Sequence, residues 1–313
     1  MPDDGNISTP GSSGYHVAVM LHEAVEALNI RPDGMYVDCT FGGGGHSRAI
    51  LQKLGPKGKL FAFDQDEAAR ANVPDDERVV FVPHNFRHLQ RMLKLHSVSK
   101  IDGLLADLGV SSHQFDDAGR GFSIRYDADL DMRMDQRQPV TAAQLVNERS
   151  EQELHKIFEE YGEVTNARTL AKTITHYREG SKFQTISQFK EALQHVVKGN
   201  PNRYFAQVFQ ALRIAVNDEF GALKEMLEQT PDLLKPGGRL VLITFHSLED
   251  RIAKTFIRNG TFNEIQTDDI YGTRQESPFI IISKKPILPS AEETRKNPRS
   301  RSAKLRVAER KTS

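Results

Sequence analysis

A run of four glycines, Gly42 to Gly45, stands between an apolar segment and a helical pattern. Glycine lets the backbone approach a ligand closely, and the first turn of the following helix offers unpaired N–H groups. Four consecutive glycines also carry a high entropic cost on folding, so a tight turn alone explains them poorly. The segment therefore predicts a ligand-binding loop that joins a strand to a helix.

Two aspartates close apolar runs that we expect to form strands. Asp64 closes KLFAFD, 22 residues after Gly42, and Asp107 closes IDGLLAD. In an open parallel sheet, ligands bind at the edge where the strands end. We therefore expect Asp64 to accept hydrogen bonds from the ribose of a nucleoside cofactor, with a helix N-cap as the alternative. Asp107 would accept a hydrogen bond from an amino group, unless it only caps a turn.

The glycine spacing separates two classes of nucleoside cofactor. Counted from Gly42, the dinucleotide fingerprint G-x-G-x-x-G needs its third glycine at position 47, where the chain has Ser47. S-adenosylmethionine has no pyrophosphate to bind, and the spacing D-x-x-x-G-x-G from Asp38 to Gly44 suits it. We therefore favour S-adenosylmethionine over a nicotinamide dinucleotide, and a methyltransferase over a dehydrogenase.

Two other clusters of chemically active side chains carry less weight. His84 and His88 have the i, i+4 spacing of metal ligands, but no third ligand is evident, so we expect no metal site. The stretch HSLED at 246–250 suggests a hydrolase, yet the chain has no nucleophile motif of the G-x-S-x-G type. We expect Ser247 to cap a helix there, with Asp250 in its first turn, beside the substrate site.

The elements that must position these residues follow an interrupted α/β pattern. Strand and helix patterns alternate from about residue 35 to residue 109 and resume at about residue 236. Between them, residues 141–198 carry helical patterns only, and one long helical pattern covers 204–228. The alternation predicts a parallel sheet with helices on both faces. The fold class is therefore α/β, with a helical domain inserted into the sheet domain.

The composition limits the classes of protein to which the chain can belong. The chain has 313 residues, of which 38% are hydrophobic and 27% charged, as in an ordinary globular protein. Its single cysteine, Cys39, excludes an internal disulfide and fits a reducing, cytoplasmic compartment. No apolar run approaches the roughly 18 residues of a membrane span, and the polar N-terminus does not resemble a secretory signal.

Charge is distributed unevenly along the chain. Residues 284–313 hold ten Lys or Arg and three acidic residues, whereas the rest holds 32 basic and 39 acidic ones. A basic segment on an acidic body suggests a polyanionic partner, although a solvated tail that aids solubility would look the same. FNEIQ and FIIIS, at 262–266 and 279–283, are expected to form a last strand pair, and the chain after about Pro286 to be poorly ordered. The basic residues expected to contact phosphates are Arg299, Arg301, Lys304, Arg306, Arg310 and Lys311.

Six segments together resemble the RsmH (MraW) family of 16S ribosomal RNA cytosine-N4 methyltransferases. The first comprises His16 and the stretch VMLHEAVEALNIRPDGMYVDCTFGGGGHS. The others are IDGLLADLGVSSHQFDDAGRGFS, LDMRMD, FQALRIAVNDE, GGRLVLITFHSLEDR and NPRSRSAKLRVAER. They span nearly everything from His16 to Arg310. The resemblance implies a Rossmann-like S-adenosylmethionine-dependent methyltransferase core with an inserted helical domain. It also implies methylation of a cytidine N4 in the decoding centre, the P-site region, of 16S rRNA.

The resemblance further implies which residues bind the cofactor. Carried over position by position, these are Gly44, Gly45, His46, Asp64, Phe86, Asp107 and Gln114. Phe86 would stack on the adenine, with ordinary core packing as the alternative for this side chain. The four consecutive glycines depart from the more varied loop of the family, which bears on the rigidity of the loop.

Asp107 is the expected catalytic residue. The amino nitrogen of cytosine is a poor nucleophile because its lone pair is delocalised into the ring. An acceptor on its N–H would localise the lone pair and later take the proton, and our candidate for that acceptor is Asp107 or a nearby backbone carbonyl. One alternative function is an S-adenosylmethionine-dependent amino-methyltransferase of another RNA or of DNA, although the DNA enzymes usually carry a D-P-P-Y-like motif in place of DLGV. A non-catalytic RNA-binding module would not need the glycine loop together with Asp64.

The expected partner is 16S rRNA in the small ribosomal subunit or in a late assembly particle, with no membrane, and a homodimer is left open. The target base must be unstacked or flipped to reach the site, while the helical insertion and the basic tail hold the RNA backbone. By the resemblance, the alternative for the tail is that it folds back on the body of the protein and stabilises it. The chain is expected to divide into a flexible tail at 1–15, the first part of the methyltransferase core at 16–115, the helical insertion at 116–212, the second part of the core at 213–288 and a basic tail at 289–313.

Overall fold

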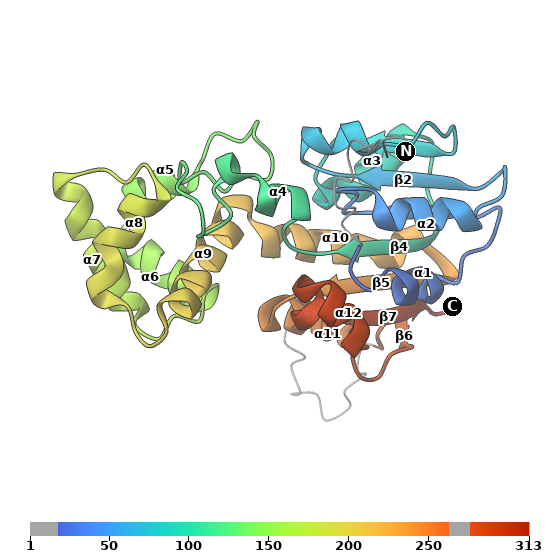
Figure 1. The fold of residues 1–313 in the computed structure, drawn as a ribbon. Helices are drawn as coiled ribbons and strands as arrows, with labels where there is room; N and C mark the ends of the chain where they lie inside the picture. The colour runs from blue at the N-terminus through green and yellow to red at the C-terminus, as the bar shows by residue number, and fades with distance from the viewer. Residues whose placement is uncertain (1–17, 263–275, 313) are drawn as a thin grey trace, which may run out of the picture.

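The computed structural model describes residues 18–262 and 276–312, and Figure 1 shows them as two lobes joined by helices α9 and α10. The N-terminal tail expected at 1–15 lies outside these residues. In the described ranges, no helix combines the length and the apolar character needed to cross a bilayer.

The larger lobe is built on a seven-stranded sheet with the order β3-β2-β1-β4-β5-β7-β6. Strands β1 to β5 run parallel, while β7 runs antiparallel to both β5 and β6. The parallel strands are β1 (Met35–Asp38), β2 (Lys59–Phe63), β3 (Val79–Val82), β4 (Ile101–Asp107) and β5 (Leu234–Thr244). The strand order reverses between β1 and β4, and ligands bind beside such a switch point in open α/β sheets. The expected α/β class is therefore confirmed.

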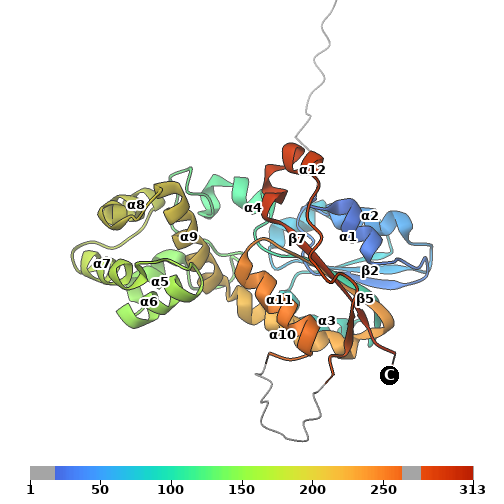
Figure 2. The ribbon, with the colours of Figure 1, turned by 90° about the horizontal axis from the view of Figure 1, so that it is seen from below.

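Helices cover both faces of this sheet, as Figure 2 shows from below. α1 (Leu21–Ala27) and α2 (Gly45–Lys53) bury their apolar sides in one cluster, with Tyr36 and Leu60 of the strands. On the opposite face, α3 (Leu89–Leu95), α10 (Glu219–Leu233) and α11 (Ser247–Asn259) share a second cluster. The central strands are apolar on both sides because each side faces a helix layer.

The smaller lobe is helical and has a core of its own. Its helices are α5 (Ala142–Glu148), α6 (Glu151–Glu160), α7 (Ala167–Gly180), α8 (Ile186–Leu193) and α9 (Pro201–Asn217). Thr141, Ser150 and Thr185 each begin a helix with a reciprocal capping box, in which Gln or Glu three residues later bonds back to the cap. One continuous apolar cluster fills this lobe and reaches as far as Val216 at the end of α9.

The single long helix expected over 204–228 is wrong, because the chain turns at Asp218. Asp218 adopts a left-handed conformation with φ 46°, which ends α9 and starts α10 in a new direction. The apolar face of α9 packs in the helical lobe, whereas that of α10 packs on the sheet. Hydrophobic periodicity runs across this junction, so the pattern alone did not reveal the turn. The division of the chain at 212/213 stays a prediction, and that point lies inside α9.

The expectation of a poorly ordered C-terminal tail is also wrong. After α12 (Ala291–Lys296), β7 (Lys304–Arg310) lies inside the sheet between β5 and β6 (Phe279–Ile281). Leu305 and Val307 of β7 belong to the same apolar cluster as Val241 and Ile243 of β5. The expected strand at 279–283 is present as β6, but its partner is β7. The other half of the expected pair lies outside the described residues from position 263 onward.

Most of the basic residues expected to contact phosphates have partners within the protein. The Arg306 guanidinium bonds both carboxylate oxygens of Asp250, at 2.6 and 3.0 Å, with only 9% of its side chain exposed. The other pairs are Arg299 with Asp116, Lys304 with Asp250, Lys311 with Glu276, and Arg310 with the carbonyl oxygens of Pro231 and Pro278. Arg301 is exposed. The C-terminal segment therefore supports the fold rather than forming a free basic arm.

Candidate active site

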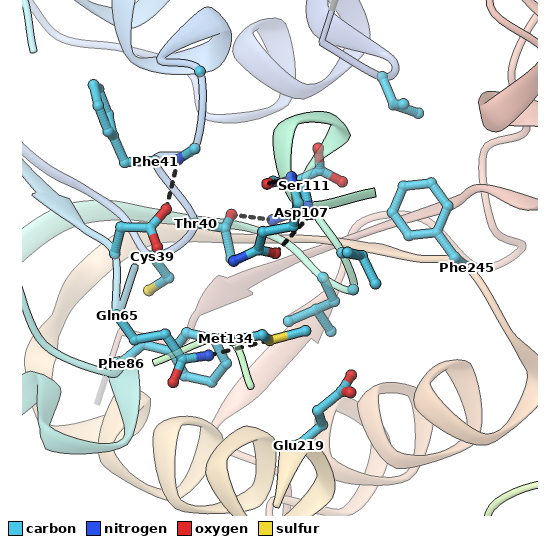
Figure 3. A pocket seen from close by; sticks show the side chains of 18 of the residues that line it. Cys39, Thr40, Phe41, Gln65, Phe86, Asp107, Ser111, Met134, Glu219 and Phe245 are labelled. Carbon is cyan, nitrogen blue, oxygen red and sulfur yellow. Dashed lines mark hydrogen bonds between the residues drawn. The ribbon is translucent and has the colours of Figure 1, made fainter. Parts of the chain in front are cut away.

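A cavity of about 810 Å³ opens at the carboxyl ends of β1, β2, β4 and β5, beside the junction of α9 and α10. Its size is toward the upper end for small-molecule sites. Figure 3 shows its two ends: Cys39, Phe41, Gln65 and Phe86 lie at one end, Glu219 and Phe245 lie at the other, and Asp107 is between them. The walls therefore come from both the sheet and the start of α10.

The glycine loop forms one wall. Gly42 and Gly44 have positive φ angles of 49° and 75°, which favour glycine over other residues. A Cβ placed on Gly43 would meet no described atom within 4 Å, although Gly43 lines the cavity. A Cβ on Gly45, the first residue of α2, would instead lie 2.8 Å from the Cβ of Ala18. The loop thus presents bare backbone to the cavity at Gly43, while Gly45 is required for packing.

Asp64 stands at the end of β2 and fixes this loop. Its Oδ2 accepts the N–H of Gly42 at 2.7 Å, and its Oδ1 accepts the N–H of Asp66 at 2.8 Å. The helix N-cap that was the alternative for Asp64 is supplied by Asp66, whose side chain accepts the N–H of Ala68. Burial raises the pKa of Asp64 to about 6, against the opposing effect of these two N–H groups. Each oxygen keeps one acceptor direction for a ligand.

Asp107 lies at the end of β4 and lines the middle of the cavity. Its own N–H donates to the Thr40 hydroxyl at 2.7 Å. Among the described residues, no donor bonds its buried Oδ1. Burial raises the pKa of Asp107 well above the usual range, and the negative charges of Asp38 and Glu249 act in the same direction.

His46 closes the wall beside Asp107. Its Nε2–H donates to the carbonyl oxygen of Val19 at 3.1 Å, and its Nδ1 lies 3.8 Å from Asp107 Oδ2. Burial lowers the pKa of His46, while the nearby Asp38 opposes that shift. Asp38 is itself buried and accepts a hydrogen bond from the Ser47 hydroxyl at 2.7 Å. The imidazole therefore anchors the segment before α1 to the start of α2.

Six of the seven residues that the resemblance assigned to the cofactor line this cavity, and Gly44 does not. Phe86 lies on the wall at the start of a short 3₁₀ helix that leads into α3. Gln114 also reaches the wall, but it is buried and its Nε2 donates to Asp66 Oδ2 at 2.9 Å. Arg120 donates to the same oxygen at 2.9 Å. Gln114 therefore links the loop after β4 to the loop after β2.

The second end of the cavity was largely missed from the sequence. Its walls include Glu219 and Phe220 at the start of α10, and Phe245 and Glu249 after β5. Their sequence signals were FQALRIAVNDE, which carried no assignment to this site, and HSLED, which was expected beside the substrate site without a chemical role there. The two segments meet only because of the turn at Asp218.

The cap of α11 differs from the expectation. The N-cap is His246 rather than Ser247, and its side chain accepts the N–H of Glu249. Glu249 in turn accepts the N–H of Phe245 at 2.9 Å. Burial would raise the pKa of Glu249, but its contacts with His246 and the charge of Arg213 bring it below the usual value. The expected position beside the cavity is correct, since Glu249 and Phe245 line it.

No metal site emerges within 18–262 and 276–312, where no three His, Cys, Asp or Glu side chains gather as ligands. His84 and His88 are both exposed.

The family model and the similar proteins found by comparison agree on one family. The family model described as the MraW methylase family matches residues 13–311. Three similar proteins carry the name ribosomal RNA small subunit methyltransferase H. The one from Parabacteroides distasonis is 53% identical over 299 residues, which cover 95% of this chain and 98% of the relative. The one from Flavobacterium johnsoniae is 52% identical over 296 residues, with 94% and 97% covered. The one from Cytophaga hutchinsonii is 51% identical over 299 residues, with 95% and 99% covered.

Proposed function

Because the chain belongs to the MraW methylase family, we propose that it methylates the N4 amino group of a cytidine in the decoding centre, the P-site region, of 16S rRNA. Members of this family are S-adenosylmethionine-dependent methyltransferases, and so is this chain. The names of its relatives indicate small-subunit ribosomal RNA as the substrate. The proposal adds the base, the atom and the place in the RNA. The observation that carries it is the carboxyl side chain of Asp107, which lines the middle of the cavity and is 21% exposed there.

The residues at the glycine-loop end fit the nucleoside part of the cofactor. Gly43 leaves the backbone open to the cavity, and Asp64 keeps acceptor directions suited to two ribose hydroxyl groups. Phe86 offers a flat apolar surface for the adenine. When bound, S-adenosylmethionine supplies a methyl group on a positively charged sulfur. Gly45, His46 and Gln114 complete the proposed contacts by forming the surrounding wall.

Asp107 serves as the acceptor for the amino group. Methyl transfer forms a bond between N4 and the methyl carbon, breaks the carbon–sulfur bond and releases one N4 proton. An acceptor on the N–H raises the reactivity of N4 and takes this proton. Burial raises the pKa of Asp107 well above its usual range, which makes the ionised carboxylate a stronger proton acceptor than a solvent-exposed one. The main task of the rest of the cavity is to hold N4 and the methyl group in line.

The proposed substrate particle is the small ribosomal subunit or a late assembly particle, because the base lies in structured RNA. A base in such RNA must be flipped out of its stack to enter the cavity. Reaction on ribosomal particles supports a cytoplasmic location for the protein. A homodimer stays a prediction.

The test is to incubate unmethylated small subunits with cofactor labelled in the methyl group, then digest the rRNA and identify the labelled nucleoside. We expect the label on cytidine N4 at one position in the decoding centre. Short isolated RNA of the same sequence serves as the comparison and should react poorly. Label on a base carbon, on a ribose or on a protein would contradict the proposal.

A further inference from the structure

The α10 end of the cavity has a composition unlike that of the glycine-loop end. Two aromatic rings, Phe220 and Phe245, line it together with the carboxylates of Glu219 and Glu249. In Figure 3 the Glu219 carboxylate rises from α10 into the cavity, with Phe245 to one side and the residues of the other end farther away. Flat apolar surface beside hydrogen-bond acceptors suits a planar ring that carries an N–H donor.

Glu219 is held in a fixed orientation. The Arg213 guanidinium donates to both of its oxygens, from Nε at 2.8 Å and from a terminal nitrogen at 3.0 Å. Such a two-point pair fixes the plane of a carboxylate. Each oxygen still has an acceptor direction left, and 11% of the side chain is exposed, at the cavity wall. The turn at Asp218 places Arg213 and Glu219 close together, so the pair depends on the junction of the two lobes.

Glu249 is less available to a ligand than Glu219. Its Oε2 accepts the N–H of Phe245 at 2.9 Å, and its Oε1 lies 3.1 Å from Nε2 of His246. Only 3% of its side chain is exposed. Glu249 therefore holds the backbone that carries Phe245, while Glu219 is the carboxylate of this end with room for a donor.

We propose that the α10 end of the cavity binds the target base and that Glu219 accepts a hydrogen bond from its exocyclic amino group. This inference rests on the proposed function, because the base is taken to be the methyl acceptor. Phe245 supplies the surface on which the ring stacks. A keto base such as uracil would turn a carbonyl oxygen toward the Glu219 oxygens, and two acceptors repel each other. Glu219 thus selects amino-bearing bases, in addition to the acceptor role of Asp107.

The test compares Glu219→Gln with a matched control on the same helix. Glu225 also forms a two-point pair with an arginine, Arg87, at 2.8 and 3.1 Å, but it is half exposed and does not line the cavity. Methylation of unmethylated small subunits is measured, together with the affinity for S-adenosylhomocysteine. For Glu219→Gln we expect kcat/KM to fall at least twentyfold while the affinity for S-adenosylhomocysteine stays within twofold. Glu225→Gln should leave both quantities within twofold of the wild type.

Glu219→Asp keeps the test decisive if Glu219→Gln does not fold. Aspartate keeps a carboxylate that can pair with Arg213. Its side chain is one methylene group shorter, so the carboxylate reaches less far into the cavity. We expect the same loss of kcat/KM with normal binding of S-adenosylhomocysteine. A folded Glu219 variant that reacts within twofold of the wild type overturns the base subsite. Failure of the proposed function looks different, because the wild type itself would then place no label on cytidine N4.

Competition between nucleotides checks selectivity directly. With S-adenosylmethionine at a saturating concentration, cytidine 5′-monophosphate should inhibit methylation of subunits at concentrations at least tenfold lower than uridine 5′-monophosphate. Glu219→Gln should reduce this ratio to within twofold. An unchanged ratio in the variant, or no preference in the wild type, counts against the proposal.

Discussion

The carboxylate of Asp64 accepts the backbone N–H of Gly42 at 2.7 Å, so the end of β2 holds the loop that follows β1. The same carboxylate is the proposed acceptor for the ribose hydroxyls. Occupation of the cavity and the conformation of the glycine loop are therefore coupled through one side chain. The pH dependence of cofactor binding follows from this carboxylate, because burial raises its pKa to about 6.

We predict that affinity for S-adenosylhomocysteine increases as the pH rises through about 6 and levels off above about 7. Only the ionised carboxylate offers both oxygens to the ribose, so the affinity should fall by about tenfold between pH 7 and pH 5. Calorimetric titration at each pH measures this change. In Asp64→Asn the profile should be flat and the affinity low. A wild-type dissociation constant that is constant from pH 5 to 8 would be incompatible with the proposed role.

The stability of the ligand-free protein should change in the opposite direction. Because the pKa of Asp64 is higher in the folded protein than its ordinary value of 3.8, the folded state binds this proton more tightly. The contribution of Asp64 to stability is complete below pH 3.8 and is lost as the pH rises through about 6. Urea unfolding of Asp64→Asn beside the wild type, at pH 5 and pH 7, isolates this contribution. The gap in favour of the variant should be larger at pH 7.

Two glycine substitutions should separate ligand approach from packing. Gly43→Ala places its Cβ in open space at the cavity wall, so the free energy of unfolding should change by less than about 0.5 kcal/mol. The affinity for S-adenosylhomocysteine should nevertheless fall at least tenfold. Gly45→Ala would crowd the Cβ of Ala18 and should destabilise the protein by about 1–3 kcal/mol. If Gly43→Ala binds normally, the backbone of this loop does not approach the ligand closely.

Asp107→Asn should separate catalysis from cofactor binding. The amide keeps the shape of the side chain but is a poor proton acceptor, so kcat should fall by about 10²–10⁴-fold. Removal of a carboxyl that is buried near Asp38 and Glu249 should leave the free energy of unfolding unchanged or higher. Single-turnover methylation of small subunits and calorimetry with S-adenosylhomocysteine measure the two effects. Parallel loss of rate and cofactor affinity would assign Asp107 to cofactor binding alone.

Arg306→Met should destabilise the whole sheet lobe. Arg306 and Asp250 form a largely buried pair, and removal of one partner leaves the other charge without compensation. Such a loss costs about 3–5 kcal/mol, reduced here because Lys304 Nζ lies 3.6 Å from Asp250. Urea denaturation gives the value. Lys296→Met, at an exposed pair with Glu292, is the control and should have no measurable effect. A wild-type unfolding curve for Arg306→Met would show that β7 is not held by this pair.

Much of the sheet and one end of the site could be predicted from the sequence. The parallel strands are short apolar runs, and their carboxyl ends share one edge, so Asp64 and Asp107 could be placed together before any contact was known. The glycine run marked the loop between them. These signals are local in the sequence, and the topology of a parallel sheet brings the residues that carry them to one edge.

The parts that escaped prediction depend on contacts between distant segments. In KLRVAER the charges obscured a period-two alternation, in which Leu305 and Val307 enter the core. Arg306 becomes a buried residue only because α11 brings Asp250 to it. Glu219 likewise reaches the cavity because the chain turns at Asp218, a single left-handed residue. The hydrophobic pattern gives no sign of this turn.

Strand β7 lies in the interior of the sheet although it comes last in the order of synthesis. Its neighbour β5 ends at Thr244, some 60 residues earlier, and pairs with it from Arg239 to Thr244. A nascent chain therefore exposes the apolar edge of β5 until the ribosome has passed residue 310, even if the helical lobe folds earlier on its own core. Translation that stops before residue 304 would release a chain with an open sheet edge, prone to aggregation and a target for chaperones.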